Sequence, residues 1–174
     1  MRSGLKLGRL WGIRIGIDWS WLIIFLLITW NLSIVFQAQH ENWSKGVVWG
    51  TAIAASLLFF ASILAHELAH SLLAKMFKIP VEDITLFLFG GVSNIQKQPT
   101  APRHEFQMSI VGPITSIVLG ILFLFAASIM IGPIETGTED MKQFFSELSP
   151  LATLLLWLGP VNIFVGLFNL LPGF

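Results

Sequence analysis

The chain has 174 residues, of which 55% are hydrophobic and only 11% are charged, against about 25% charged in an ordinary soluble domain. This composition is typical of a membrane protein with several spans, for which the lipid bilayer is the expected partner, and it excludes a soluble domain of any size. The formal net charge is zero and no basic block occurs, so nucleic acid is not an expected partner. There is no cysteine, which excludes disulfide bonds and cysteine-ligated metal sites.

Four apolar segments are long enough to cross a bilayer as helices, which takes about 20 residues. They are predicted at about residues 17–36, 47–77, 108–131 and 151–171. The second is longer than a perpendicular crossing needs, so we expect it to tilt or to project beyond the bilayer. Basic residues precede the first segment, as in a signal peptide, but no clear cleavage site follows, and we interpret it as an uncleaved span.

Lysine and arginine are distributed unequally between the two sides of these spans. The N-terminal segment and the loop after the second span carry eight of the ten, and the other side carries only Lys45 and Lys142. Cytoplasmic loops of membrane proteins are enriched in these residues. We therefore predict that the N-terminus is cytoplasmic.

His66-Glu67-Leu68-Ala69-His70 lies inside the second apolar segment. In a helix the two histidines lie about 40° apart on one face, where both imidazoles can bind one zinc ion. Glu67 is then beside them as a base for the attacking water. A charged glutamate in a bilayer segment costs roughly 2.5 kcal/mol or more, so its presence indicates a function. The alternative is a pair of core histidines next to an incidental carboxylate.

The motif lies about 28 Å of helix beyond residue 47, which predicts a depth near the cytoplasmic end of the span, within reach of water. Two further histidines are less favourable ligands. His40 is predicted on the opposite side of the membrane, and His104 lies in a polar loop and is expected to be solvated.

Residues 81–95 separate the second and third apolar segments. Pro80 ends the helix, and a short run of β-branched and aromatic residues leads to a Gly90-Gly91 turn. We interpret this segment as a β-hairpin that re-enters the membrane, where it needs protein or a water-filled cavity beside it. Its free edge could bind an extended peptide. A surface loop with a hydrophobic anchor is the alternative. A short, weakly amphipathic helix is predicted at 140–148.

Four motifs, in this order, resemble those of the site-2 proteases, zinc metalloproteases that cleave transmembrane helices. They are His66-Glu67-Leu68-Ala69-His70, Gly90-Gly91-Val92-Ser93-Asn94, Val111-Gly112-Pro113 and Phe168-Asn169-Leu170-Leu171-Pro172-Gly173-Phe174. The resemblance covers nearly the whole chain and is greatest to a prokaryotic branch that often carries CBS domains, which implies a prokaryotic cell membrane. The expected fold is an all-α polytopic membrane protein with about four transmembrane helices and a re-entrant β-hairpin between the second and third. Residues 1–174 would form a single metalloprotease core.

The resemblance implies an intramembrane zinc endopeptidase whose substrates are transmembrane proteins. His66 and His70 would bind the zinc ion, and Glu67 would be the general base. In the family the third ligand is the Asp of a Pro-x-Asp-Gly motif after the fourth span. This chain stops at Phe174, so we expect it to be C-terminally incomplete and inactive by itself.

The resemblance also suggests substrate-binding roles for Gly91, Asn94 and Asn169. Each asparagine could instead form a turn or an interhelical hydrogen bond, and Gly112-Pro113 is expected at a helix start or a packing contact. Two other functions remain open. One is a different membrane zinc protease with a glutamate as third ligand, against which the Asn169 motif argues. The other is a catalytically inactive scaffold, against which the intact Glu67 argues.

Overall fold

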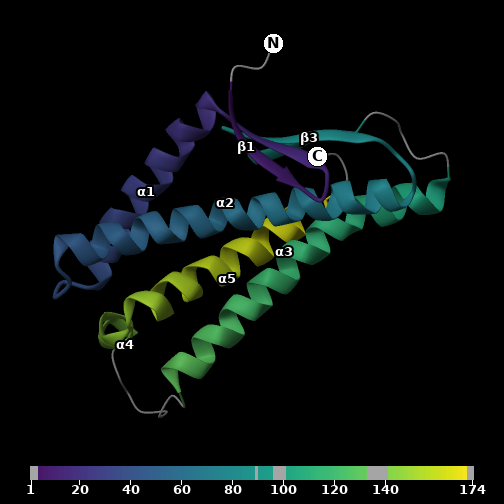
Figure 1. Cartoon of the computed structure of the whole chain (residues 1–174). Coiled ribbons are helices and arrows are strands. Elements are labelled where there is room, and N and C mark those ends of the chain that lie inside the picture. Colours follow the sequence, from purple (N-terminus) through teal and green to yellow (C-terminus); the bar gives the residue numbers. More distant parts are fainter. Residues whose placement is uncertain (1–3, 89, 96–100, 133–140, 172–174) are drawn as a thin grey trace.

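The computed structural model describes residues 4–88, 90–95, 101–132 and 141–171. Its elements follow one another in the order shown in Figure 1. They are β1 (Gly4–Leu10), β2 (Ile13–Asp18), α1 (Trp19–Gln39), α2 (Lys45–Met76), β3 (Val81–Phe87), β4 (Gly90–Ile95), α3 (Pro102–Ile131), α4 (Met141–Glu147) and α5 (Pro150–Phe168).

Four helices within the described part of the chain, α1, α2, α3 and α5, are long and apolar enough to cross a membrane. They coincide with the four predicted segments. Helix α2 has 32 residues, or about 48 Å of helix, which exceeds the hydrocarbon thickness of about 30 Å as expected. Asp18, Ser44 and Ser149 cap the first turns of α1, α2 and α5, because each side chain accepts a hydrogen bond from a main-chain N–H of that turn.

The predicted helical fold with four apolar helices is confirmed, but the term all-α is too narrow, because the mostly helical chain also contains a four-stranded sheet in the order β1-β2-β3-β4. The hairpin β1–β2 was not predicted, and α1 begins only at Trp19 because residues 17 and 18 belong to β2. Along β2, Ile13 and Ile15 are buried while Arg14 is exposed. This alternation is the period of a strand that covers a core with one face.

The predicted hairpin at 81–95 is present as the antiparallel pair β3–β4. Residue 89, in its turn, lies outside the described residues. Strand β3 also pairs in parallel with β2, so the hairpin is half of the sheet rather than an isolated loop. Strand β4 is left as an edge strand.

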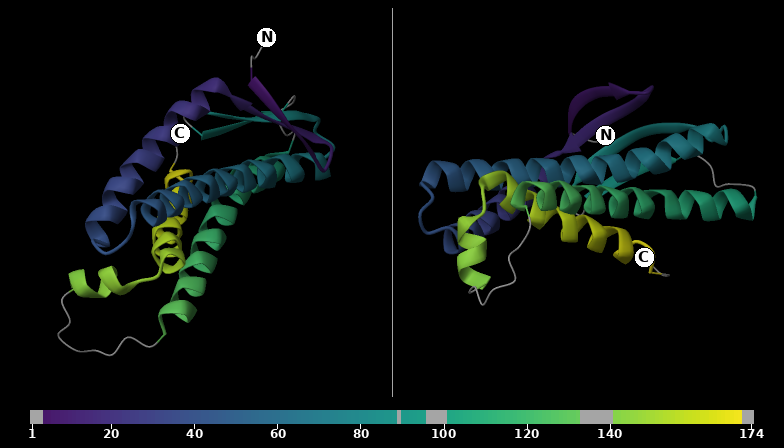
Figure 2. Two further views of the ribbon diagram at one scale, coloured as in Figure 1. Left: turned by 60° about the vertical axis from the view of Figure 1, so that its left-hand side comes forward. Right: turned by 90° about the horizontal axis from the view of Figure 1, so that it is seen from below.

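The sheet lies along the C-terminal half of α2, while α3 and α5 lie on the other side of that helix (Figures 1 and 2). Ile13 of β2 and Ile84 of β3 pack with Leu68 of α2 in one buried cluster. On the other side α3 and α5 approach closely, since a Cβ at Gly120 would lie 2.6 Å from the carbonyl oxygen of Gly159. The first set of contacts holds the C-terminal half of α2 against the sheet, and the second holds α3 against α5.

His40 lies at the opposite end of α2 from the histidine motif, directly after α1. Its ring is 1% exposed and stacks on Trp43 with ring centroids 3.7 Å apart. Nδ1 lies 3.2 Å from the carbonyl oxygen of Ser146, and Nε2 lies 2.9 Å from the hydroxyl of Thr153. His40 therefore connects the end of α1 to α4 and α5, and burial lowers its pKa below the ordinary 6.5.

Candidate metal centre

His66 and His70 are brought together on one face of α2. Their Nε2 atoms are 3.2 Å apart, and His66 is only 5% exposed. Two nitrogen ligands at 2.0–2.1 Å from a tetrahedral zinc ion are separated by about 3.3 Å. The distance between the two Nε2 atoms therefore fits a shared zinc ion.

The other nitrogen of each ring is held by α3. Nδ1 of His70 lies 2.5 Å from the carbonyl oxygen of Met108, and Nδ1 of His66 lies 2.9 Å from the hydroxyl of Ser116. A carbonyl oxygen can only accept, so Nδ1 of His70 carries the hydrogen and Nε2 keeps its lone pair. The Ser116 hydroxyl can accept in the same way. Second-sphere hydrogen bonds of this kind orient histidine ligands in known metal sites.

Gly112 lies midway between Met108 and Ser116, so these three residues form one row on α3 at four-residue spacing. A Cβ at Gly112 would overlap Nε2 of His70 and lie 2.6 Å from Nε2 of His66. The expectation that Gly112-Pro113 starts a helix is wrong, because α3 begins at Pro102. The alternative, a packing contact, is confirmed. Because Gly112 has no side chain, the space beside both Nε2 atoms stays open.

The carboxylate of Glu67 is held on the side of α2 that the sheet covers. Its Oε2 accepts a 2.6 Å hydrogen bond from the hydroxyl of Ser93 on β4. A Cβ at Gly91 would lie 2.5 Å from Cγ of Glu67, so the absence of a side chain there lets β4 approach the carboxylate. Strand β4 therefore places one residue without a side chain and one hydroxyl against Glu67.

A cleft of about 480 Å³ opens beside His66 and Glu67. Gly91 and Asn169, two of the candidate substrate-binding residues, also line it. The exposed Asn169 ends α5 and donates to the carbonyl oxygen of Val165 at 2.8 Å. The remaining walls are Gly90 and a set of apolar side chains that come mainly from α1, α2 and α5: Ile24, Ile28, Phe59, Phe60, Ile63, Leu88, Phe164, Val165 and Phe168.

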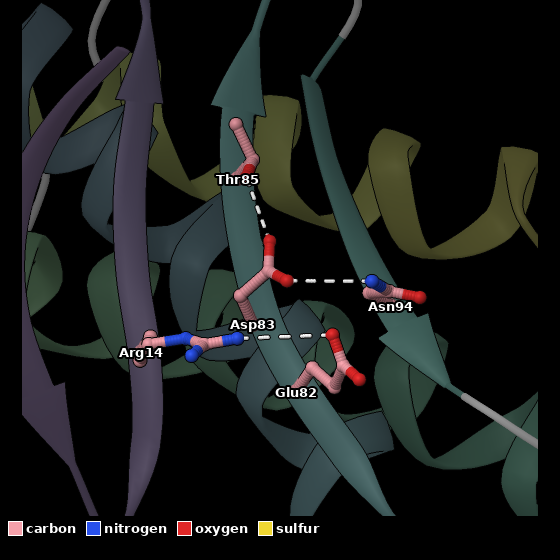
Figure 3. A network of polar contacts seen from close by, with 5 residues as sticks. All are labelled: Arg14, Glu82, Asp83, Thr85 and Asn94. Carbon is pink, nitrogen blue, oxygen red and sulfur yellow. Dashed lines mark hydrogen bonds and ion pairs between the residues drawn. The ribbon is translucent and has the colours of Figure 1, made fainter. Parts of the chain in front are cut away.

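Asn94, the third candidate substrate-binding residue, is not brought to the histidines. Its amide donates to Asp83 of β3 at 3.4 Å, and Asp83 also accepts from Thr85 at 3.1 Å (Figure 3). Successive residues of a strand point to opposite faces, so Asn94 lies on the outer face of the sheet while Ser93 faces α2.

The ion pair of Arg14 with Glu82, at 3.7 Å, is largely exposed and links β2 to β3 (Figure 3).

Two histidines are the metal ligands that the described part of the chain brings together. Within it, no group of three His, Cys, Asp or Glu residues could hold a metal ion. His40 lies at the other end of α2, and His104 stacks on Phe77 with ring centroids 4.0 Å apart, so it is half-buried rather than fully solvated. The residues present fit two protein ligands of a zinc site and its base.

Sequence reasoning did not assign three residues to contacts with the His66–His70 motif: Ser93, Gly112 and Ser116. The spacing of Gly112 and Ser116 along one face of α3 could have indicated that they share a neighbour. Ser93 could not have been paired with Glu67, because that contact depends on how β4 lies across α2.

Several known proteins are similar to this chain in sequence or in fold. The family model of peptidase family M50 matches residues 54–174. The chain is 34% identical over 173 residues to the zinc metalloprotease Rip3 of Mycobacterium tuberculosis, with 99% of this chain and 41% of that protein covered. It is 29% identical over 174 residues to the zinc metalloprotease MJ0392 of Methanocaldococcus jannaschii, with 43% of that protein covered. The chain thus spans about two fifths of the length of these relatives.

The fold is also similar to a solved structure, the site-2 protease from Methanocaldococcus jannaschii. The TM-score is 0.62 at 27% identity, with 99% of this chain and 66% of that chain covered. The relatives given above carry the name zinc metalloprotease, and four helices in the described part of this chain are apolar enough to cross a membrane. The chain therefore belongs to peptidase family M50, the family of the site-2 proteases.

Proposed function

We propose that the protein is an intramembrane zinc endopeptidase that hydrolyses peptide bonds in the transmembrane helices of membrane-anchored substrates. The observation that carries this proposal is the 3.2 Å convergence of the Nε2 atoms of His66 and His70 in a cleft that also contains Glu67. The apolar walls of the cleft suit the side chains of a transmembrane segment. Residues 1–174 act in this proposal as a single metalloprotease core.

Zinc would be held by Nε2 of His66 and of His70, with a third ligand outside the described residues, for which an Asp of the family type is the natural candidate. When bound, zinc acts as a Lewis acid that lowers the pKa of water toward about 7. The contacts of both Nδ1 atoms with the Ser116 hydroxyl and the Met108 carbonyl would leave each Nε2 available to the ion.

Glu67 is the general base in this mechanism. It directly follows His66 in the helical turn that joins the two histidine ligands, and it lines the same cleft as His66. Its carboxylate takes the proton of the attacking water and passes a proton to the leaving amine. Because Ser93 binds Oε2, the other oxygen, Oε1, is the one left for this transfer.

A transmembrane substrate must unwind before its peptide bonds can be reached, and edge strand β4 can replace the hydrogen bonds that it loses. Along a strand, the main-chain N–H and C=O groups of one residue point toward the paired strand and those of the next residue point to the opposite edge. In a hairpin with a two-residue turn, the two residues that flank the turn are hydrogen-bonded to each other. Counting from the pair Phe87–Gly90, we expect the main-chain groups of Gly91 and Ser93 to face the open edge. In this arrangement the hairpin re-enters the membrane beside the cleft.

The candidate substrate-binding residues have different parts in this proposal. Gly91 lets the unwound chain approach Glu67, and Asn169 offers its amide at the cleft. Asn94 acts from the outer face by fixing β4 to β3. The N-terminus is cytoplasmic in this proposal, so the cleft lies near the cytoplasmic side of the cell membrane.

Replacing the base tests the proposal directly. In the full-length gene product, Glu67→Gln keeps the size of the side chain but cannot accept the proton, so cleavage of a transmembrane substrate should be abolished while zinc content is retained. Cleavage within roughly tenfold of the wild type would remove Glu67 from the mechanism. A wild-type protein that captures substrates without cleaving them would instead support the alternative, an inactive scaffold of the same fold.

A further inference from the structure

Ser93 is the contact through which the edge strand reaches the carboxylate of Glu67. Its hydroxyl donates to Oε2 at 2.6 Å and also lies 3.4 Å from the main-chain oxygen of Glu67. Hydrogen bonds to a charged acceptor are shorter and stronger than those between neutral groups. This bond therefore selects one orientation of a long side chain that would otherwise have several.

A second serine directs the Ser93 hydroxyl. Ser71 lies one helical turn after Glu67, is completely buried, and donates to Oγ of Ser93 at 3.2 Å. Since Oγ of Ser93 accepts that bond, its own hydrogen is left for Glu67. The three side chains thus form a directed series from Ser71 through Ser93 to Oε2.

The geometry leaves the two oxygens of Glu67 in different surroundings. Oε2 is bound to Ser93, whereas Oε1 lies on the side of Gly91, 3.5 Å from where a Cβ of that residue would be. Gly91 lines the cleft together with Glu67 and His66. The oxygen without the serine bond is therefore the one nearer the part of β4 that lines the cleft.

We propose that Ser93, supported by Ser71, is a positioning residue that fixes the carboxylate of Glu67 with Oε1 ready to take the proton of the attacking water. The inference rests on the proposed function, in which Glu67 is the general base. It also gives β4 a second part in the reaction, because the main chain of Ser93 faces the edge where the substrate pairs while its hydroxyl holds the base. A substrate strand that orders β4 thereby orders the base as well.

The test is a set of Ser93 variants in the full-length gene product, measured for kcat, KM, zinc content and thermal unfolding. Ser93→Ala should lower kcat on the order of 10- to 100-fold, part of the 10²–10⁴ that general acid–base catalysis contributes, with KM within about twofold. Zinc content should be unchanged, because Ser93 contacts neither histidine ligand. Ser93→Thr, which keeps the hydroxyl, should recover most of the rate, and Ser71→Ala should lose only a few-fold.

Ser128→Ala is the matched control, because Ser128 is an exposed serine of α3 whose hydroxyl bonds only to its own helix, and it should match the wild type. Ser93→Cys is a second variant in case Ser93→Ala does not fold. The thiol is a weak donor, so its kcat should also fall.

Several outcomes would overturn the inference. Wild-type kcat in Ser93→Ala or Ser93→Cys, or no recovery in Ser93→Thr, contradicts positioning, and loss of zinc with a lowered unfolding temperature assigns Ser93 to the fold instead. Glu67→Gln separates this failure from that of the proposed function. If Glu67→Gln still cleaves, both fail. If it does not cleave but Ser93→Ala does so at the normal rate, only the positioning role fails.

Discussion

Gly112→Ala should remove zinc from the site without removing either histidine. The added Cβ would lie 2.6 Å from Nε2 of His66 and closer still to Nε2 of His70, whereas ordinary contacts begin at 3.4 Å. The His66 nitrogen would have to move by about 0.8 Å, and metal–ligand distances tolerate only about 0.2 Å. We therefore expect zinc affinity to fall by at least about 100-fold, the upper range for second-sphere changes, because here the ligands themselves are displaced.

The assay measures zinc by elemental analysis after dialysis against a graded series of chelators, together with thermal unfolding. The thermal unfolding measurement is needed to detect a loss of stability, because an alanine before Pro113 also meets the proline ring, which opposes the helical conformation. Gly50→Ala is the matched control, since Gly50 lies in α2 with nothing within 4 Å of the added Cβ, and alanine favours helix. A folded Gly112→Ala protein with wild-type zinc affinity would refute the placement of the metal between the two Nε2 atoms.

Three further predictions concern the substrate, the ligand set and the far end of α2. A proline scan of a cleaved substrate should slow cleavage at every second position near the scissile bond, because only alternate N–H groups pair with β4, and a uniform response would contradict strand pairing. The 174-residue chain alone should bind zinc weakly and show no turnover, so stoichiometric zinc after mild chelation would mean that a third ligand lies within it. Because burial lowers the pKa of His40, the folded state resists its protonation; stability from the neutral ring is complete above pH 6.5 and is lost as the pH falls toward the folded pKa. Thermal unfolding should therefore show a loss on acidification below pH 6.5 that His40→Gln lacks, and parallel pH profiles of the two proteins would contradict it.

The helical part of the fold was predictable because it depends on composition and length alone. The segment at 150–168, for example, carries no charge, is almost entirely apolar and is preceded by a capping serine, Ser149. The hairpin β1–β2 carried a weaker signal. The alternation of Ile13, Arg14 and Ile15 is only a few residues long and runs directly into an apolar helix, so the two periods merge at residues 17–19.

The site was predictable where its residues are neighbours on one helix. His66 and His70 converge because they are four residues apart, about one helical turn, and this spacing can be read from the sequence. Ser116 and Ser93 could not be assigned, because they reach the motif only through the packing of α3 and β4 against α2. Asn94 was chosen by resemblance, and the face on which it lies depends on the register of β4, in which a shift of one residue reverses every side chain.

X-ray absorption at the zinc edge tests the central claim, that His66 and His70 bind one zinc ion through Nε2, most directly. The full-length gene product, purified with zinc, should show two imidazole ligands with Zn–N distances of about 2.0–2.1 Å together with oxygen ligands. His70→Ala should lose one imidazole and most of the bound zinc. Stoichiometric zinc with an unchanged imidazole signal in His70→Ala, or a wild-type spectrum without imidazole, would contradict the account.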